Sequence, residues 1–100
     1  MKEQPECKVD KYGNKRWYLN GEWHREDGPA VEGANGTKQW FLHGKRHRED
    51  GPAYVSRGGR TRLWWLHDEP VDPETLVDLW LSRGIFCYYD EEANELRFDA

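Results

Sequence analysis

One hundred residues suffice for a single domain, and 36% hydrophobic with 34% charged residues predicts a folded chain with a small core. Six tryptophans, five tyrosines and three phenylalanines enlarge that core, because aromatic side chains bury more area than the average residue. The formal net charge is −4, residues 1–6 are polar, and no apolar run is long enough to cross a bilayer, so we expect a cytoplasmic protein without a signal peptide or membrane anchor.

Three β-hairpins are predicted over the first two thirds of the chain. A turn-forming pair stands at the centre of each: Gly13-Asn14, Asn35-Gly36 and Gly58-Gly59. The flanking runs are rich in aromatic and β-branched residues, so we pair residues 7–12 with 15–19, 30–34 with 37–42, and 53–56 with 61–66. Alternation puts one tryptophan and one leucine of each hairpin on the same face of an antiparallel meander: Trp17 with Leu19, Trp40 with Leu42, and Trp64 with Leu66.

The hairpins belong to a sequence repeat. The seven residues from His24 to Ala30 (HREDGPA) return unchanged from His47 to Ala53, 23 positions later (47 − 24). The strand that comes before the motif occurs a third time in diverged form, without the motif after it. We therefore expect the array to cover about residues 7–70.

The seven-residue motif is predicted to be structural, because a recurring motif does what every unit needs, here turning the chain and joining adjacent hairpins. We expect Gly28 and Gly51 to adopt a positive φ. The arginines should pair with glutamates of the motif: Arg25 with Glu26 and Arg48 with Glu49, within a unit or between units. Asp27 and Asp50 should cap the turn. His24 and His47 are expected to be structural and not metal ligands.

The repeat resembles a known family. Its 23-residue period, one hairpin per unit and aromatic-to-glycine spacing resemble the MORN (membrane occupation and recognition nexus) repeat. More narrowly, the form W-x-x-x-G-x-x-HREDGPA, starting at Trp17 and Trp40, is similar to a variant found in small proteins of bacteria and their phages. The gap from tryptophan to glycine is one residue longer than in the general repeat. The resemblance implies a twisted sheet used for binding, without a catalytic site.

A helix is predicted from about residue 73 to 83. Asp72 suits the N-cap, Pro73 the first helical position, and Gly84 the left-handed residue past the end. Three apolar residues at helical spacing are expected to cover the tryptophan face: Leu76, Leu79 and Trp80.

A second hairpin is predicted to follow the helix, with strands at 85–89 and 95–98. Residues 72–100 contain eight acids and two bases, a net charge of −6. The predicted fold class is therefore α+β and mostly β: one domain with a hairpin-repeat sheet (7–70), a covering helix (72–84) and an acidic hairpin (85–99).

The sequence offers no active site. We find no Ser–His–Asp or Cys–His arrangement and no glycine-rich phosphate loop. Cys7 and Cys87 lack the neighbours of a metal or redox site and are expected to be reduced thiols. We therefore expect no cofactor, no metal and no enzymatic activity.

These properties favour a protein-binding module. The resemblance narrows this to a small phage or bacterial inhibitor that occludes a host defence protein, as anti-CRISPR proteins do, or to an antitoxin. The alternative is nucleic-acid binding by an aromatic face with interleaved bases, which the negative net charge disfavours. The same negative charge disfavours binding to anionic lipid. A homodimer through a free sheet edge or the C-terminal hairpin is a further expectation.

The acidic hairpin is the predicted partner-binding site. It brings together two tyrosines and four carboxylates: Tyr88, Tyr89, Asp90, Glu91, Glu92 and Glu95. Because like charges gain nothing locally from crowding, we expect the carboxylates to face a basic groove of the partner, such as the nucleic-acid channel of a nuclease, with the tyrosines as anchors.

Overall fold

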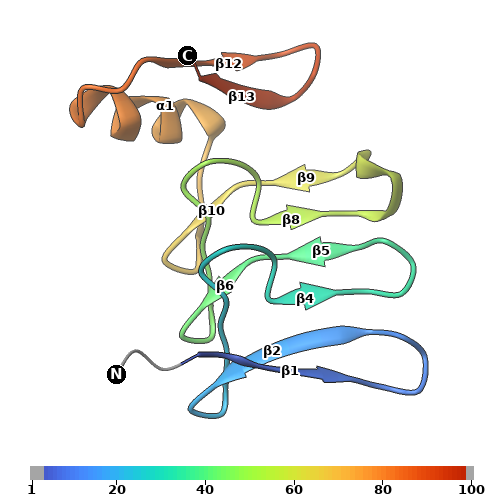
Figure 1. The fold of residues 1–100 in the computed structure, drawn as a ribbon. Coiled ribbons are helices and arrows are strands. Elements are labelled where there is room, and N and C mark those ends of the chain that lie inside the picture. Colours follow the sequence, from blue (N-terminus) through green and yellow to red (C-terminus); the bar gives the residue numbers. More distant parts are fainter. Residues whose placement is uncertain (1–3, 99–100) are drawn as a thin grey trace.

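The computed structural model describes residues 4–98 and has the predicted α+β, mostly β architecture (Figure 1). Residues 1–3, which belong to the polar start of the chain, and residues 99–100, which include Asp99 of the predicted acidic hairpin, lie outside the described residues. Seven strands form one antiparallel sheet in the spatial order β1 (Glu6–Val9), β2 (Lys15–Leu19), β4 (Val31–Glu32), β5 (Lys38–Gln39), β8 (Tyr54–Val55) and β9 (Arg62–Leu63), with β3 (Glu22–Trp23) also on β2.

Each repeat contains a second, shorter hairpin that the sequence analysis did not predict. The long hairpins are β1–β2, β4–β5 and β8–β9, and a 3-10 turn (Arg57–Gly59) lies in the last one. The short ones are β2–β3, β6 (Phe41–Leu42) with β7 (Lys45–Arg46), and β10 (Trp65–Leu66) with β11 (Glu69–Pro70). Their two-residue turns have positive φ at both positions, as a type I′ turn requires: Asn20-Gly21, His43-Gly44 and His67-Asp68.

The expected backbone conformation of the motif glycines is wrong. Neither Gly28 nor Gly51 has a positive φ. A Cβ atom at Gly51 would lie 2.7 Å from Cζ of Arg48, and one at Gly28 would lie 2.9 Å from Cζ of Arg25. These positions are glycine because the guanidinium group of the same motif occupies the space that a side chain would need.

Helix α1 (Pro73–Ser82) begins where predicted and ends one residue early. Asp72 has the extended backbone of an N-cap, although its side chain makes no capping hydrogen bond. In Figure 1 the helix lies beyond the third unit and closes that end of the array, and Leu76 is fully buried there. The expectation from the sequence that the helix covers the tryptophan face is wrong for most of the face, because the helix lies at one end of the array (Figure 1).

The C-terminal hairpin forms a sheet of its own, β12 (Cys87–Asp90) with β13 (Glu95–Phe98), and packs on α1. Cys87 is buried there, and burial raises the pKa of its thiol, whereas Cys7 is exposed on β1; both thiols are free. No helix among residues 4–98 is long and apolar enough to span a bilayer.

Candidate functional site

The arginines of the repeated motif cover two of the three tryptophans of the tryptophan face. Cζ of Arg25 lies 4.0 Å from the ring centre of Trp17, and Cζ of Arg48 lies 4.0 Å from that of Trp40. Each guanidinium donates from Nε to the aspartate two residues on, at 3.0 Å and 2.9 Å, and from Nη1 to a proline carbonyl of the motif. The expected pairing of these arginines with the motif glutamates is thus replaced by pairing with the aspartates.

The motif histidines join one unit to the next, as their predicted structural role requires. Nδ1 of His24 accepts a hydrogen bond from the backbone N–H of His43 at 2.9 Å, and Nδ1 of His47 accepts one from His67 at 3.0 Å. The paired rings lie 4.3 Å and 4.4 Å apart. Each buried histidine therefore fixes the short turn of the following unit, and it must be unprotonated at Nδ1 to do so.

Acid should loosen these junctions. Burial, then the neighbouring His43 or His67, holds the pKa of His24 and His47 below the ordinary 6.5. The unfolded chain therefore takes up protons first as the pH falls. The free energy of unfolding should keep its full value above about pH 6.5 and fall below it, by up to about 1.4 kcal/mol per pH unit for each histidine. Urea unfolding between about pH 7.5 and about pH 5 measures this slope.

The matched control is the double variant His24→Asn with His47→Asn. The asparagine oxygen can accept the same backbone hydrogen bond but takes up no proton in this range, so the slope should flatten. The carboxylates with lowered pKa, Asp10 (about 2), Glu49 and Asp90, lose their contribution only below their unfolded values of 3.8 to 4.5, outside this window. An unchanged slope in the double variant would assign the acid sensitivity to other groups.

The third tryptophan is covered differently, because its unit lacks the motif. The backbone of Val71 still donates to the carbonyl of Trp64 at 2.9 Å, as His24 and His47 do to Trp17 and Trp40. In place of an arginine, the ring of Tyr89 meets Trp64 edge-on with ring centres 6.0 Å apart, and Trp64 is only 6% exposed. Helix α1 and the C-terminal hairpin therefore complete the last unit of the array.

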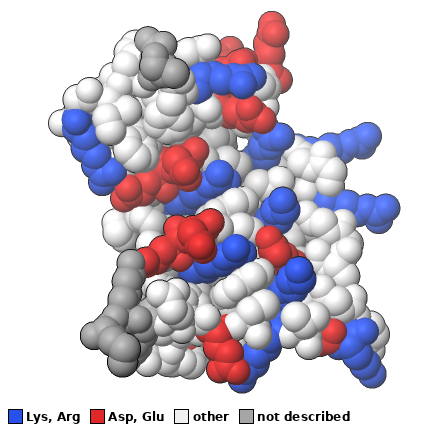
Figure 2. Space-filling model, viewed as in Figure 1, with Lys and Arg blue, Asp and Glu red and all other residues white. Residues whose placement is uncertain are grey.

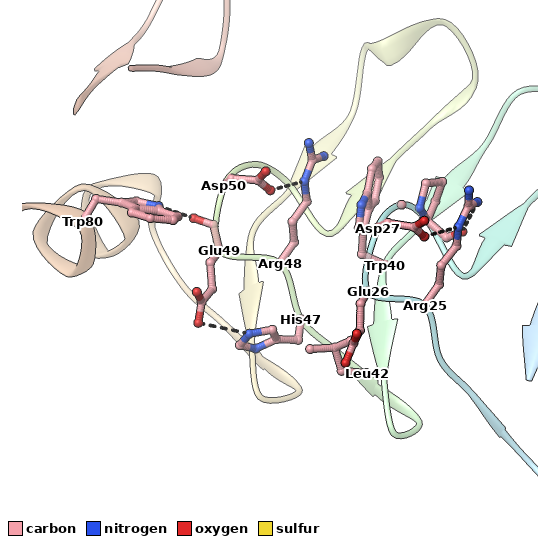
Figure 3. A pocket seen from close by; sticks show the side chains of 12 residues that line it. Arg25, Glu26, Asp27, Trp40, Leu42, His47, Arg48, Glu49, Asp50 and Trp80 are labelled. Atoms are coloured by element: carbon pink, nitrogen blue, oxygen red, sulfur yellow. Dashed lines mark hydrogen bonds and ion pairs between the residues drawn. The ribbon is translucent and has the colours of Figure 1, made fainter. Parts of the chain in front are cut away.

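A groove of about 650 Å³ lies between the two motif copies and α1 (Figure 3). Its charged walls are largely neutralised within the chain by the pairs Arg25–Asp27, Arg48–Asp50 and Glu49–Arg83. Trp80 at its end donates from Nε1 to the carbonyl of Glu49 at 2.8 Å. Among the described residues, no three His, Cys, Asp or Glu side chains are grouped so that they could hold a metal ion.

The structure divides the predicted site into free and engaged residues. Tyr88, Glu91 and Glu92 are exposed. The other three are tied within the fold. The hydroxyl of Tyr89 donates to Asn94 at 2.6 Å.

Asp90 accepts from the backbone N–H groups of Glu92 and Ala93 and from Arg97, and these contacts hold its pKa below the ordinary value. Glu95 pairs with Arg97 and Arg62, each at 3.5 Å. The acidic hairpin is therefore held in shape by its own hydrogen bonds and ion pairs, and its tip presents two exposed carboxylates, those of Glu91 and Glu92.

Tyr88 was predicted as an anchor, but sequence reasoning missed the other exposed apolar residues of the C-terminal part, which lie toward the end of the hairpin away from the tip. We call helix α1 and the hairpin after it, residues 73–98, the C-terminal cap. Five of the eight exposed large apolar side chains of residues 4–98 belong to it, and we call them the cap cluster: Leu81, Ile85, Phe86, Tyr88 and Phe98. Phe86 is 57% exposed and Tyr88 is 51% exposed, and their ring centres lie 6.4 Å apart. An uninterrupted apolar run at 85–89 carried the signal, but such a run does not show which side faces solvent.

Charge is distributed unevenly over the molecule. Figure 2 shows basic side chains along the edge where the long hairpins turn, and acidic ones near the free end of the C-terminal hairpin. No family model, curated protein or solved structure matches this chain. The class is defined by the fold itself: an array of paired β-hairpins, interlocked by histidine and arginine, with a helix and an acidic hairpin closing one end.

Proposed function

We propose that this protein is a non-enzymatic protein-binding module that uses its C-terminal cap to cover a basic surface of its partner. The observation that carries the proposal is the cap cluster, five exposed apolar side chains on the helix and hairpin that also present the exposed carboxylates of Glu91 and Glu92, outside the repeated part of the chain. An apolar centre with aromatic anchors and a charged rim is the usual anatomy of a protein interface.

The proposed roles of the site residues follow from their contacts. Phe86 and Tyr88 are the anchors, because their rings are exposed and adjacent. Glu91 and Glu92 steer the encounter and pair with bases of the partner. Tyr89, Asp90 and Glu95 act indirectly by holding the hairpin in shape, which reduces the entropy lost on binding.

The partner proposed is a basic, nucleic-acid-binding defence protein in the cytoplasm. An acidic hairpin fits such a groove by charge, and the resemblance to repeat proteins of bacteria and phages supports an inhibitor of the anti-CRISPR kind or an antitoxin. A nucleic-acid-binding function has less support, because the ring faces on which a base would stack at Trp17 and Trp40 are covered by Arg25 and Arg48.

Reversing the charge of the tip should slow association. In Glu91→Lys with Glu92→Lys the net charge rises by four, and the association rate with the partner should fall about tenfold or more at low salt. The partner is first identified by affinity capture and mass spectrometry, and the rates are then measured by surface plasmon resonance at several salt concentrations. The wild-type rate should fall as salt rises, and the rate of the variant should not.

The matched control is Glu22→Lys with Glu69→Lys, which changes the net charge equally at two exposed sites of the repeat array, outside helix α1 and the C-terminal hairpin. This control should keep most of the wild-type rate. Equal losses in both variants would show that only net charge matters and would remove the tip from the proposed interface. Binding to random single-stranded DNA at low salt, strong and falling steeply with salt, would favour the nucleic-acid function instead.

A further inference from the structure

The two edges of the seven-stranded sheet are not equivalent. At the β9 edge, Nη1 of Arg62 donates to the carbonyls of Ala93 and Asn94 at 2.7 Å and 3.0 Å, so the C-terminal hairpin lies against that edge. At the opposite edge, β1 pairs only with β2 within the described part of the chain, and all four of its residues are exposed. An open strand with unpaired backbone groups is a template for another strand.

The hydrogen-bond pattern shows which backbone groups of β1 point outward. The N–H of Trp17 donates to Ala30 and its carbonyl accepts from His24, so both groups of Trp17 point away from β1. Cys7 stands opposite Trp17 in the antiparallel ladder. In such a ladder the backbone groups of two opposed residues either bond to each other or point away from each other on the outer sides of the two strands. Because the groups of Trp17 point away from β1, the N–H and carbonyl of Cys7 point away from β2, to the open side. Val9, two residues on, faces the same way.

We propose that two copies of this chain pair through β1, antiparallel, about a twofold axis at Cys7. Twofold symmetry requires one residue of the strand to face its own copy. A centre at Glu6 or Lys8 would place like charges directly opposite each other, which destabilises a sheet. A centre at Cys7 instead places Glu6 opposite the partner's Lys8, and this pair occurs twice. The pattern of charges on the strand therefore selects the register.

A centre at Val9 is the remaining symmetric choice, and the local structure disfavours it. It would draw Asp10 into the pairing, but the Asp10 carboxylate already accepts from the backbone of Tyr12 and Asn14 and from the side chain of Arg16. The Cys7 centre keeps this turn intact. It also places Pro5, which has no N–H to donate, at the end of the new ladder, opposite the partner's Val9.

Cys7 itself supplies the test of this register. Directly opposed residues of a bonded antiparallel pair have Cα atoms about 5.5 Å apart, which lies within the range that a disulfide spans. The thiol of Cys7 is exposed and that of Cys87 is buried, so a disulfide reports on Cys7 alone. The pairing uses neither the cap cluster nor the acidic tip, so the proposed partner-binding function and this dimer stand or fall separately.

The experiment is oxidation of the full chain at about 50 µM with diamide, which takes up the two electrons and two protons that two thiols release on forming a disulfide. Rapid covalent dimer formation is expected for the wild type and for Cys87→Ser, and none for Cys7→Ser. Glu6→Lys should reduce the rate at least tenfold, because the introduced lysine of each copy then faces a lysine of the other. The swapped variant Glu6→Lys with Lys8→Glu should restore it. Sedimentation of the reduced proteins should follow the same order.

Two results would overturn the proposal. One is a wild-type protein that sediments as a monomer at that concentration and cross-links no faster than Glu6→Lys. The other is a variant with the cysteine moved to position 8 (Cys7→Ser with Lys8→Cys) that cross-links as fast as the wild type, because that result indicates random collision and no fixed register.

Discussion

Replacing Trp64 by alanine is expected to lower the free energy of unfolding by about 3–5 kcal/mol, which would leave so small a domain largely unfolded. Trp64 is the most buried tryptophan of the repeat face, at 6% exposure. Its ring is covered by Tyr89, so its loss opens a cavity where the array meets the C-terminal hairpin. Urea unfolding followed by circular dichroism measures the change.

Trp40→Ala is the matched control, since Trp40 holds the equivalent place one unit earlier. Trp40 is half-buried and is covered by the end of a long arginine side chain, which can move to fill part of the space. Its replacement should cost less than that of Trp64, by at least about 1 kcal/mol. Equal costs at the two positions would show that the C-terminal hairpin contributes no more cover than Arg48 does.

Replacing Trp80 by alanine should cost about 3 kcal/mol, at the low end for a buried aromatic residue because the side chain is half-buried. Trp80 joins three parts of the molecule. Its ring meets Phe98 edge-on at 5.3 Å, Arg83 lies over it, and its Nε1 donates to Glu49 of the second unit. The helix should therefore detach from the array, and thermal unfolding should show a lower and broader transition.

Trp80→Phe separates packing from hydrogen bonding. Phenylalanine keeps an aromatic ring against Phe98 but leaves the carbonyl of Glu49 without its donor, so we expect a loss of about 1 kcal/mol. A loss as large as that of Trp80→Ala would assign the whole effect to the hydrogen bond. Melting of Trp80→Ala within a few degrees of the wild type would mean that the helix is not needed to close the array.

Local rules predicted the elements well where the residue type itself fixes the backbone. Asn35-Gly36 lies in the connection of the predicted β4–β5 hairpin, and Pro73 opens the helix. Only Gly36 of the pair has a positive φ, so the expected type I′ turn is replaced by a longer connection from Glu32 to Lys38. The turn of the short hairpin was missed, although Asn20-Gly21 carries the Asn-Gly signal of a type I′ turn in the first unit. In the second unit the equivalent pair is His43-Gly44, and His43 also has a positive φ. Its conformation is stabilised by His24, nineteen residues earlier in the chain (43 − 24).

The sequence by itself determined that this protein is an array of alike hairpins followed by one helix and one acidic hairpin. Exact repetition, turn-forming pairs and the Asp-Pro helix start are local features, and each acts through the backbone of its own segment. Only the tertiary structure decided which side chains cover the tryptophans and which apolar residues stay exposed. Alternation divides a strand into two faces but does not say which face is buried, because burial depends on the unit that stacks against it.

Three outcomes depended on that stacking. Arginines, and not the helix, cover Trp17 and Trp40; the motif glycines make room for those arginines; and the apolar run after the helix leaves Phe86 and Tyr88 in solvent. The open edge at β1 has the same origin, since one end of the array is closed by a helix and a hairpin while the first strand has a described neighbour on one side only. All of these features depend on which surfaces of the array pack together, and contacts between segments far apart in the sequence determine that packing.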